Sequence, residues 1–461
     1  MFRLITITNP PLEVNHNWRQ ATGLMVARNF LEIDNNIFYP RIDDHCGQEG
    51  IIGMEFPSLN YLHYLVATLF GYTHWYGRLI NLLISSIGIY FYGKIIGRFF
   101  SKKIVLASTL FLLCSIWFTF SRKMMADTYC ISIMFVAIFY GIRYLEKGGI
   151  WRLILFSVLA SIGILSKIPA GIYFGLAIPL AFKNYNLSRK ISLSISIVLP
   201  LTLTYLWYFV WCPFLSTEYG IWFNSGRELN IGFNEIVTNF NLCLENFYFH
   251  ALKSYIILSL FILGLFSMFR KANWQLIFTF LSIGSIFLVY IFKSGFFFYH
   301  HDYYIIPFVP MMALISSYAL SLINRKWIVG LIMIAGVSEG ILNQVHDFVI
   351  EDSEKYKLNL TEIADYTSLK QDLIVINGNA NPQQIYLTHR KGCTCSNSQL
   401  SDSEYLNALR DRGYKYLFVN KHIANPSISK TNVYEDSDYI VYDLNKTAKK
   451  NDNQTSPTNG R

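Results

Sequence analysis

The stretch LINLLISSIGIYFYGKIIGRFFSKKIVLASTLFLLCSIWFTFS (residues 79–121) decides the fold class, because two long apolar runs flank one basic hinge. An α-helix needs about 20 mostly apolar residues to cross the hydrocarbon core of a bilayer. We therefore expect two membrane spans here, at 79–97 and 103–121, joined by a basic turn. The pattern predicts a helical membrane protein, since helices satisfy their own backbone groups in lipid.

The same pattern recurs over the first three quarters of the chain, and the composition agrees with it. Of the 461 residues, 52% are hydrophobic and only 15% are charged, whereas globular domains carry about 25% charged residues. We expect about ten spans, at 79–97, 103–121, 125–143, 151–167, 168–182, 191–212, 251–269, 274–293, 303–323 and 326–343.

Lys and Arg lie in every second connection between these spans, which sets the predicted orientation. Cytoplasmic loops are enriched in Lys and Arg, so the basic connections are assigned to the cytoplasm. Residues 1–78, the Lys167 turn, the 213–250 segment and everything after about residue 344 then face the other side. In this interpretation the Lys and Arg residues that produce the net charge of +9 serve to orient the helices. No nucleic-acid partner is expected.

The N-terminal segment raises a question of its own. MFRLITIT is too short to cross a bilayer, although the residues after it are predicted to lie outside. We expect that a first span is missing through a mis-called start or a truncated record. The alternative is an N-terminus that crosses without a helix of its own.

Three domains are predicted: a transmembrane domain over 1–345, a small extracytoplasmic α/β domain over 346–445 and a disordered tail over 446–461. Within the first, residues 1–78 form an outer loop and an amphipathic segment. DLIVING (372–378) predicts a strand, NPQQIYLTHRKG a helix, and YLNALRDRGYKYLFVN a helix followed by a strand. The α/β domain either binds the acceptor or packs on the membrane domain.

Seven scattered cysteines show no paired zinc framework, and we expect none of them to be catalytic. Cys393 and Cys395 are separated by one residue, which disfavours a disulfide between them. No cofactor is predicted. His300, His301 and Asp302 are a weak metal motif, because adjacent histidines point in different directions on a helix.

Four polar stretches fall on the predicted outer face. Asp127 either stabilises the N-terminus of its helix through the helix dipole or takes part in catalysis. Lys167 either extends its ammonium group to the membrane surface or binds a phosphate. Carboxylates and several cations beside aromatic helix ends suit group transfer from a lipid-linked phosphate. The stretches are EVNHNWRQ (13–20) followed by VARNF (26–30) and YPRIDDHCGQEGIIGMEFP (39–57), SRKMMADTY (121–129), LSKIPA (165–170) and SGFFFYHHDYYIIPFVP (294–310).

Eight short motifs in order carry a resemblance that covers roughly residues 10–345. Together they resemble the bacterial family 39 glycosyltransferases, relatives of dolichyl-phosphate-mannose–protein mannosyltransferases and lipid A aminoarabinose transferases within the GT-C membrane glycosyltransferases. The motifs are HNWRQ (16–20), ARNF (27–30), YPRID (39–43), EFP (55–57), WYGRLIN (75–81), MADT (125–128), SKIPA (166–170) and HDYY (301–304).

The resemblance implies a GT-C fold and an inverting transfer from a polyprenyl-phosphate-linked sugar to an extracytoplasmic lipid, glycan or protein at the inner membrane. It implies Glu13 as the base, with Asp127 second and Glu55 third; Ala21 stands where many members carry an Asp after WRQ. A divalent metal is not supported. The implied substrate-binding residues are Arg19, Arg78, Arg122 and Lys167 for the phosphate, and His16, Trp18, His301, Asp302 and Tyr303 around the sugar.

Other classes remain open at this point. A flippase or transporter for lipid-linked glycans also has many spans, but transporters bind near the midplane and often carry repeated halves, which we do not find. An O-antigen ligase or polymerase and an inactive relative that serves as an assembly partner are the remaining alternatives.

Overall fold

The computed structural model describes residues 2–221, 223, 226–378, 381–424, 426 and 428–446. Its residues divide into two compact units. Unit 1 comprises Met1–Pro40 and Ile52–Val349, and unit 2 comprises Arg41–Ile51 and Ile350–Arg461. The chain therefore leaves unit 1 for eleven residues, Arg41–Ile51, before it returns to it.

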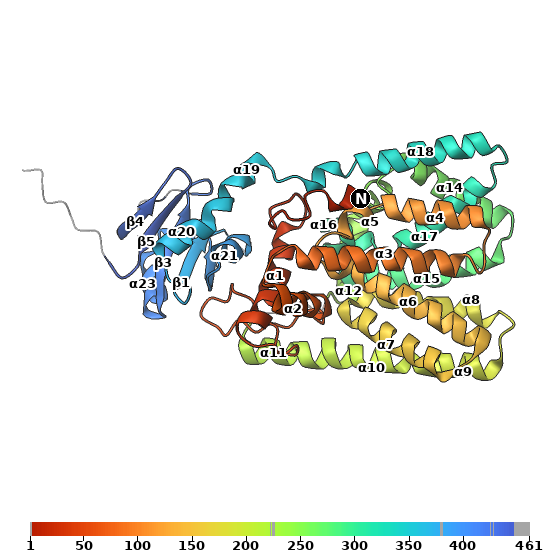
Figure 1. Cartoon of the computed structure of the whole chain (residues 1–461), viewed down its shortest axis with the longest axis horizontal. Coiled ribbons are helices and arrows are strands. Elements are labelled where there is room, and N and C mark those ends of the chain that lie inside the picture. The colour runs from red at the N-terminus through yellow and green to blue at the C-terminus, as the bar shows by residue number, and fades with distance from the viewer. Residues whose placement is uncertain are drawn as a thin grey trace, which may run out of the picture. The chain divides into compact units, whose positions relative to one another are not determined.

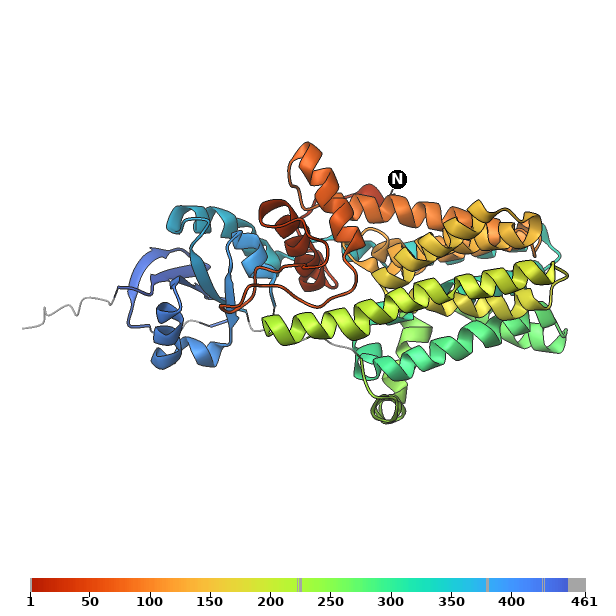
Figure 2. The same ribbon diagram turned by 90° about the horizontal axis from the view of Figure 1, so that it is seen from below.

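Unit 1 is a bundle of helices that run largely side by side (Figures 1 and 2). Helix α6 packs against α3 and α7, and α17 packs against α4 and α14. The helices of the bundle are α3 (Tyr76–Ile96), α4 (Lys102–Cys114), α5 (Trp117–Phe120), α6 (Ala126–Lys147), α7 (Ile150–Ser166), η2 (Ile168–Leu176), α8 (Ala177–Ala181), α9 (Leu187–Ser196), α10 (Val198–Tyr205), η3 (Leu206–Trp211), α11 (Cys212–Tyr219), α14 (Tyr255–Arg270), α15 (Trp274–Ser294), α17 (Val309–Ser321) and α18 (Lys326–Leu342).

Every predicted span is largely helical in the structure, and the predicted helical membrane fold is confirmed. Four helices of the described chain are individually long and apolar enough to cross a membrane: Tyr76–Ile96, Ala126–Lys147, Leu187–Tyr219 and Trp274–Ser294. A further candidate is the pair Phe240–His250 and Tyr255–Arg270, which is bent by 108°. The other predicted spans are shorter or interrupted helices.

Small residues explain how tightly α3 and α6 pack. A Cβ atom built on Gly88 of α3 would lie 2.3 Å from the side chain of Ser132 on α6, so a larger residue would push the helices apart. Nearby, Asn81 donates to the carbonyls of Lys123 and Met125 at 2.8 and 3.1 Å. These contacts fix the start of α6, where Asp127 lies.

The remaining elements of unit 1 are short helices and connecting segments. Helix α1 begins after two residues in the left-handed region, Asn15 (φ 65°) and His16 (φ 55°). These elements are η1 (Phe2–Leu4), α1 (Asn17–Glu32), α2 (Ser58–Phe70), α12 (Leu229–Thr238), α13 (Phe240–Glu245), η4 (Asn246–His250), α16 (Phe296–His300), η5 (Asp302–Ile305) and η6 (Val345–Phe348).

Unit 2 contains a five-stranded mixed sheet in the order β2-β1-β3-β5-β4. Strand β1 pairs in parallel with β2 and β3, while β5 pairs antiparallel with β3 and β4. The predicted α/β character of this region is confirmed. The elements are α19 (Asp352–Lys355), η7 (Tyr356–Asn359), α20 (Leu360–Thr367), β1 (Leu373–Asn377), α21 (Gln383–Thr388), β2 (Gly392–Cys395), α22 (Asn397–Leu400), α23 (Ser403–Asp411), β3 (Tyr414–Asn420), β4 (Thr431–Glu435) and β5 (Tyr439–Asp443).

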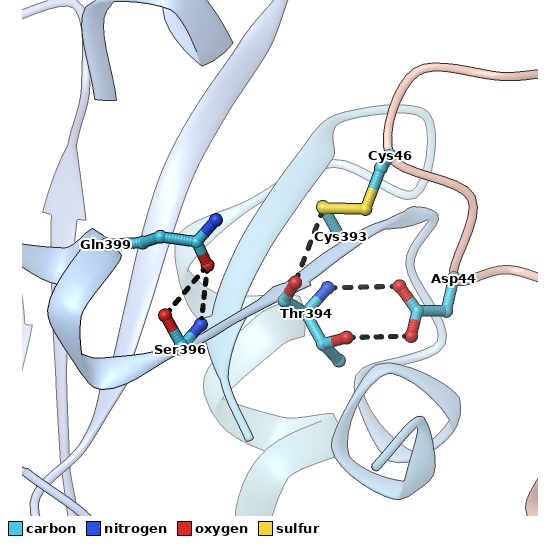
Figure 3. Close-up of a disulfide and its surroundings, with 6 residues drawn as sticks. All are labelled: Asp44, Cys46, Cys393, Thr394, Ser396 and Gln399. Atoms are coloured by element: carbon cyan, nitrogen blue, oxygen red, sulfur yellow. Dashed lines mark hydrogen bonds between the residues drawn. A yellow bond between two sulfur atoms is a disulfide. The ribbon is translucent and has the colours of Figure 1, made fainter. Parts of the chain in front are cut away.

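The segment Arg41–Ile51 covers the edge of this sheet at β2 (Figure 3). Cys46 forms a disulfide with Cys393, and the Asp44 carboxylate accepts hydrogen bonds from the Thr394 amide and hydroxyl at 3.0 and 2.9 Å. Covering an edge strand removes a template for unwanted strand pairing. The sequence analysis assigned this segment to the first outer loop and did not identify the disulfide, because its cysteines are 347 residues apart.

The predicted disordered tail, 446–461, falls outside the described residues from position 447 onward.

Candidate functional site

A cavity of about 730 Å³ lies in unit 1, where several helices begin or end. Its wall combines the start of α1, the segment Ile52–Phe56, the start of α6 and the ends of α7 and α15. Most of the wall is apolar, with side chains such as Leu201, Phe209 and Ile286. Four of the residues predicted for the site line this cavity: Trp18, Arg19, Glu55 and Lys167.

Arg19 and Glu55 form an ion pair on the cavity wall, and both side chains keep about a quarter of their surface exposed (27%). Burial raises the pKa of Glu55, but the positive charges of Arg19 and Lys167 outweigh it, so the pKa lies below its usual value. Glu55 is therefore a carboxylate at neutral pH, with exposed surface that an incoming ligand can reach.

Lys167 and Asp127 form the second ion pair of the site, at 2.5 Å between Nζ and Oδ1. Lys167 follows the last residue of α7, and Asp127 lies in the first turn of α6, so two helix ends bring them together. Asp127 Oδ2 is buried and has no hydrogen-bond partner among the described residues. Lys167 is 7% exposed, so its ammonium group pairs inside the protein and does not snorkel.

One aromatic ring connects the two pairs. The guanidinium of Arg19 lies 5.7 Å and the ammonium of Lys167 lies 4.7 Å from the centroid of Tyr303. Such contacts stabilise cations by about 0.5–2 kcal/mol, more where water is excluded. Tyr303 thus holds two cations at the same wall.

Glu13, Arg78 and Arg122 form a different cluster, which is closed. Glu13 lies 3.0 Å from Arg122 and 3.4 Å from Arg78, and all three side chains are at most 1% exposed. Arg78 also donates to backbone carbonyls such as that of Asn9 at 2.8 Å. None of the three is among the described residues that line the cavity. The structure brings these predicted residues together, but in contact with each other and away from the cavity lining.

The two predicted histidines and their neighbours lie beside the cavity wall. His16 bonds to Asp302 at 2.9 Å, and His301 stacks on Tyr303 with centroids 5.2 Å apart. Although burial opposes it, hydrogen bonding to His16 lowers the pKa of Asp302 to about 2. Burial, followed by the nearby His16 and Arg19, lowers the pKa of His301 to about 4. The neutral His301 ring supports an aromatic wall.

Within the described chain, one group of potential metal ligands lies close enough to hold an ion: Asp44, Cys46 and Cys393. The two cysteines are joined by a disulfide, so they offer no thiolate. The disulfide itself explains why these atoms lie together.

The family model described as dolichyl-phosphate-mannose-protein mannosyltransferase matches residues 55–210, a range that includes Glu55, Asp127 and Lys167. The resemblance to family 39 glycosyltransferases is confirmed. A search of curated proteins gives no significant match.

Solved structures support the same GT-C fold over the whole chain. ArnT from Cupriavidus metallidurans, bound to undecaprenyl phosphate, aligns with a TM-score of 0.62 at 12% identity, over 96% of each chain. The apo state of that protein gives the same values. At this identity the likeness concerns the fold. This fold and the apolar helices of the described chain are those of a multi-pass membrane protein.

Within this GT-C fold, the cavity has polar residues that the sequence analysis missed. Lys293 lies at the end of α15, Asn60 on α2 and Tyr304 in η5, and all three line the wall. Lys293 ends a predicted apolar span, and an ionisable residue in that position is a default functional candidate. Tyr304 belongs to the HDYY motif (301–304) but was not among the predicted site residues, and Asn60 carries no local signal.

Proposed function

We propose that this protein is an inverting glycosyltransferase, which moves a sugar from a polyprenyl-phosphate-linked donor to an extracytoplasmic lipid, glycan or protein. The observation that carries the proposal is the cavity wall, which combines a long apolar surface with Arg19, Lys167 and Glu55. A polyprenyl-phosphate sugar has the same two parts, a greasy chain and a charged polar head. The crystallisation of ArnT with undecaprenyl phosphate supports this class of donor.

Arg19 and Lys167 are the proposed ligands of the donor phosphate. In the structure each cation is paired with a carboxylate, Glu55 or Asp127. A donor phosphate offers them a second anion, and the guanidinium fork of Arg19 suits two phosphate oxygens. As the bond between the sugar and the phosphate breaks, the two cations stabilise the negative charge on the leaving polyprenyl phosphate.

Glu55 is the proposed base, because of the three predicted carboxylates it is the one that lines the cavity. The acceptor hydroxyl attacks the anomeric carbon, the bond from that carbon to the phosphate oxygen breaks, and Glu55 takes the hydroxyl proton. Asp127 orients Lys167 in this scheme. For Glu13, Arg78 and Arg122, which were predicted as site residues, we propose a structural role.

The sugar would lie against Trp18, which lines the cavity, with His301 and Tyr303 behind it. His16 and Asp302 support this wall through their hydrogen bond. Aromatic faces combine an apolar surface with polar edges, which suits sugar rings.

The Cys46–Cys393 disulfide supports an extracytoplasmic location of unit 2, because disulfides persist in oxidising compartments. Ile52, at the cavity wall, follows the disulfide-bonded segment directly in sequence. The basic connections are then cytoplasmic, as the positive-inside rule requires. We propose the inner membrane, with the cavity open to the outer face.

The test is a turnover assay in detergent with undecaprenyl-phosphate sugars and, in parallel, undecaprenyl-diphosphate sugars. We expect release of undecaprenyl phosphate from the monophosphate donors, together with an inverted glycosidic bond in the product. Turnover of diphosphate donors alone would instead indicate a ligase or polymerase. Movement of the intact lipid across vesicles without bond cleavage would indicate a flippase, and either result would overturn the proposal.

A further inference from the structure

One π-helical turn holds both of the loops that carry charge into the cavity. The turn is η3 (Leu206–Trp211), and Cys212 follows it directly. Trp207 Nε1 donates to the carbonyl of Met54, the residue before Glu55, at 2.9 Å. The Tyr208 hydroxyl donates to the carbonyl of Leu165, two residues before Lys167, at 2.8 Å.

The Leu165 carbonyl is a shared point of attachment. It belongs to the last turn of α7, where carbonyls have no partner within the helix. It accepts from Tyr208 and also from the amide of Phe56, at 3.1 Å. Two residues after Phe56 and one residue after Leu165, Ser58 and Ser166 share a hydrogen bond of 2.6 Å. The Glu55 loop, the Lys167 turn and η3 are therefore bound to one another pairwise.

Close packing restricts the same loop. A Cβ atom on Gly53 would lie 2.7 Å from the carbonyl oxygen of Cys212, so the backbone of the loop lies directly against the helix. Cys212 Sγ also donates to the Met54 carbonyl at 3.2 Å. The rings of Phe56 and Trp207 meet edge to face, with centroids 4.9 Å apart.

The element itself is unusual. π-Helical turns are rare in proteins and occur frequently at functional sites. Non-helical backbone at membrane depth is tolerated where its polar groups find partners within the protein. In this helix, the side chains of the π turn provide those partners for the loop carbonyls next to the two charged residues.

We infer that η3 is a positioning element, and that Trp207 and Tyr208 are positioning residues that set the Glu55 carboxylate relative to the Lys167 ammonium. Neither acts on the donor by its hydrogen bond; each acts through the loop that it holds. The structural part of the inference stands by itself, and its catalytic consequence rests on the proposed function.

The structural part is tested by hydrogen–deuterium exchange of the full-length protein. Tyr208→Phe removes one hydroxyl and keeps the ring in place. We expect faster exchange in the peptide that contains the Phe56 amide, in Tyr208→Phe and also in Trp207→Phe. Tyr92→Phe is the matched control, because the buried Tyr92 hydroxyl donates to the Pro310 carbonyl at 2.6 Å, away from both loops. Unchanged exchange around Phe56 in both variants would overturn the inference.

The catalytic part is tested by a double-mutant cycle with Tyr208→Phe and Glu55→Gln. A displacement of about 1 Å can cost up to a hundredfold in rate, so we expect kcat to fall ten- to a hundredfold in Tyr208→Phe, with KM changed less. In the Glu55→Gln background the same substitution should have little further effect, because the two residues act as a unit. Equal losses in both backgrounds would leave Tyr208 a merely structural residue.

The two arms separate the two claims. If wild-type protein transfers sugar from none of the polyprenyl-phosphate donors, the proposed function fails, and the exchange result still decides whether η3 holds the loops.

Discussion

Two clusters of opposite charges in unit 1 are built from the same residue types and differ in what they face. Glu13 lies between Arg78 and Arg122, with all three side chains almost completely buried. Glu55 faces Arg19 with about a quarter of each side chain exposed (27%), on the wall of a cavity. In the first cluster the charged groups pair with one another inside the protein. In the second, part of each charged side chain stays exposed at the cavity, where a ligand can reach it.

The comparison separates stability from chemistry. A buried ion pair is compensated only while every member is present, so its removal costs folding free energy. A partly exposed pair contributes less to stability, and its members can exchange partners with an incoming anion. Four predictions follow from this contrast.

The largest expected effect is on turnover, in Glu55→Gln. Loss of a general base lowers the rate by roughly 10²–10⁴-fold, so we expect a decrease of this size in kcat with a polyprenyl-phosphate sugar. The unfolding free energy should change by less than about 1 kcal/mol, because both side chains of the pair are partly exposed to solvent. Initial rates and thermal unfolding of the same preparation measure both. An active Glu55→Gln protein would remove Glu55 from the mechanism.

The matched substitution in the closed cluster, Glu13→Gln, should act in the opposite way. It leaves Arg78 and Arg122 buried without their carboxylate, which costs about 3–5 kcal/mol of folding free energy. The yield of folded protein should fall, while the turnover per folded molecule stays near that of wild type. A stable but inactive Glu13→Gln protein would restore Glu13 as the base, as the sequence analysis proposed.

A smaller effect is expected in unit 2, where Cys46→Ser and Cys393→Ser each remove the disulfide. Native disulfides typically contribute about 2–5 kcal/mol. We expect faster proteolysis of unit 2 and a lower unfolding temperature, and a reducing agent should reproduce both effects in wild type. Cys395→Ser is the control, since Cys395 is free and buried nearby in β2. Equal sensitivity of that variant would show that the disulfide is not responsible.

The smallest expected effect concerns pH. Glu55 acts as a base only when it is deprotonated, and its pKa is held below 4.5 by Arg19 and Lys167 against the effect of burial. Wild-type turnover should therefore persist on acidification down to values below the usual range of a glutamate. Arg19→Met removes the larger of the two electrostatic effects that lower the pKa of Glu55. The acid limb of the pH–rate profile of this variant should therefore move to higher pH. The residual turnover of Arg19→Met, plotted against pH, measures this shift, and an unmoved limb would contradict the assignment.

The sequence indicated many residues of the candidate site, but not how they are arranged in space. Arg19, Glu55 and Lys167 were selected from polar stretches on the predicted outer face, and the structure gathers them at one cavity. The order Glu13, Asp127, Glu55 relied on position along the chain. We propose the reverse preference between Glu13 and Glu55 because Glu13 is buried and Glu55 lines the cavity, and exposure depends on the segments that fold over each carboxylate.

The sequence by itself determined that this chain is a helical membrane protein of the GT-C type with an α/β unit. Membrane crossing is a local property of some 20 consecutive residues, and the motifs are local as well. The tertiary structure alone decided which charged side chains line the cavity, that Cys46 meets Cys393, and that a π turn near residue 208 is hydrogen-bonded to the Glu55 loop. These features join residues up to 347 positions apart, and no local pattern encodes such a meeting.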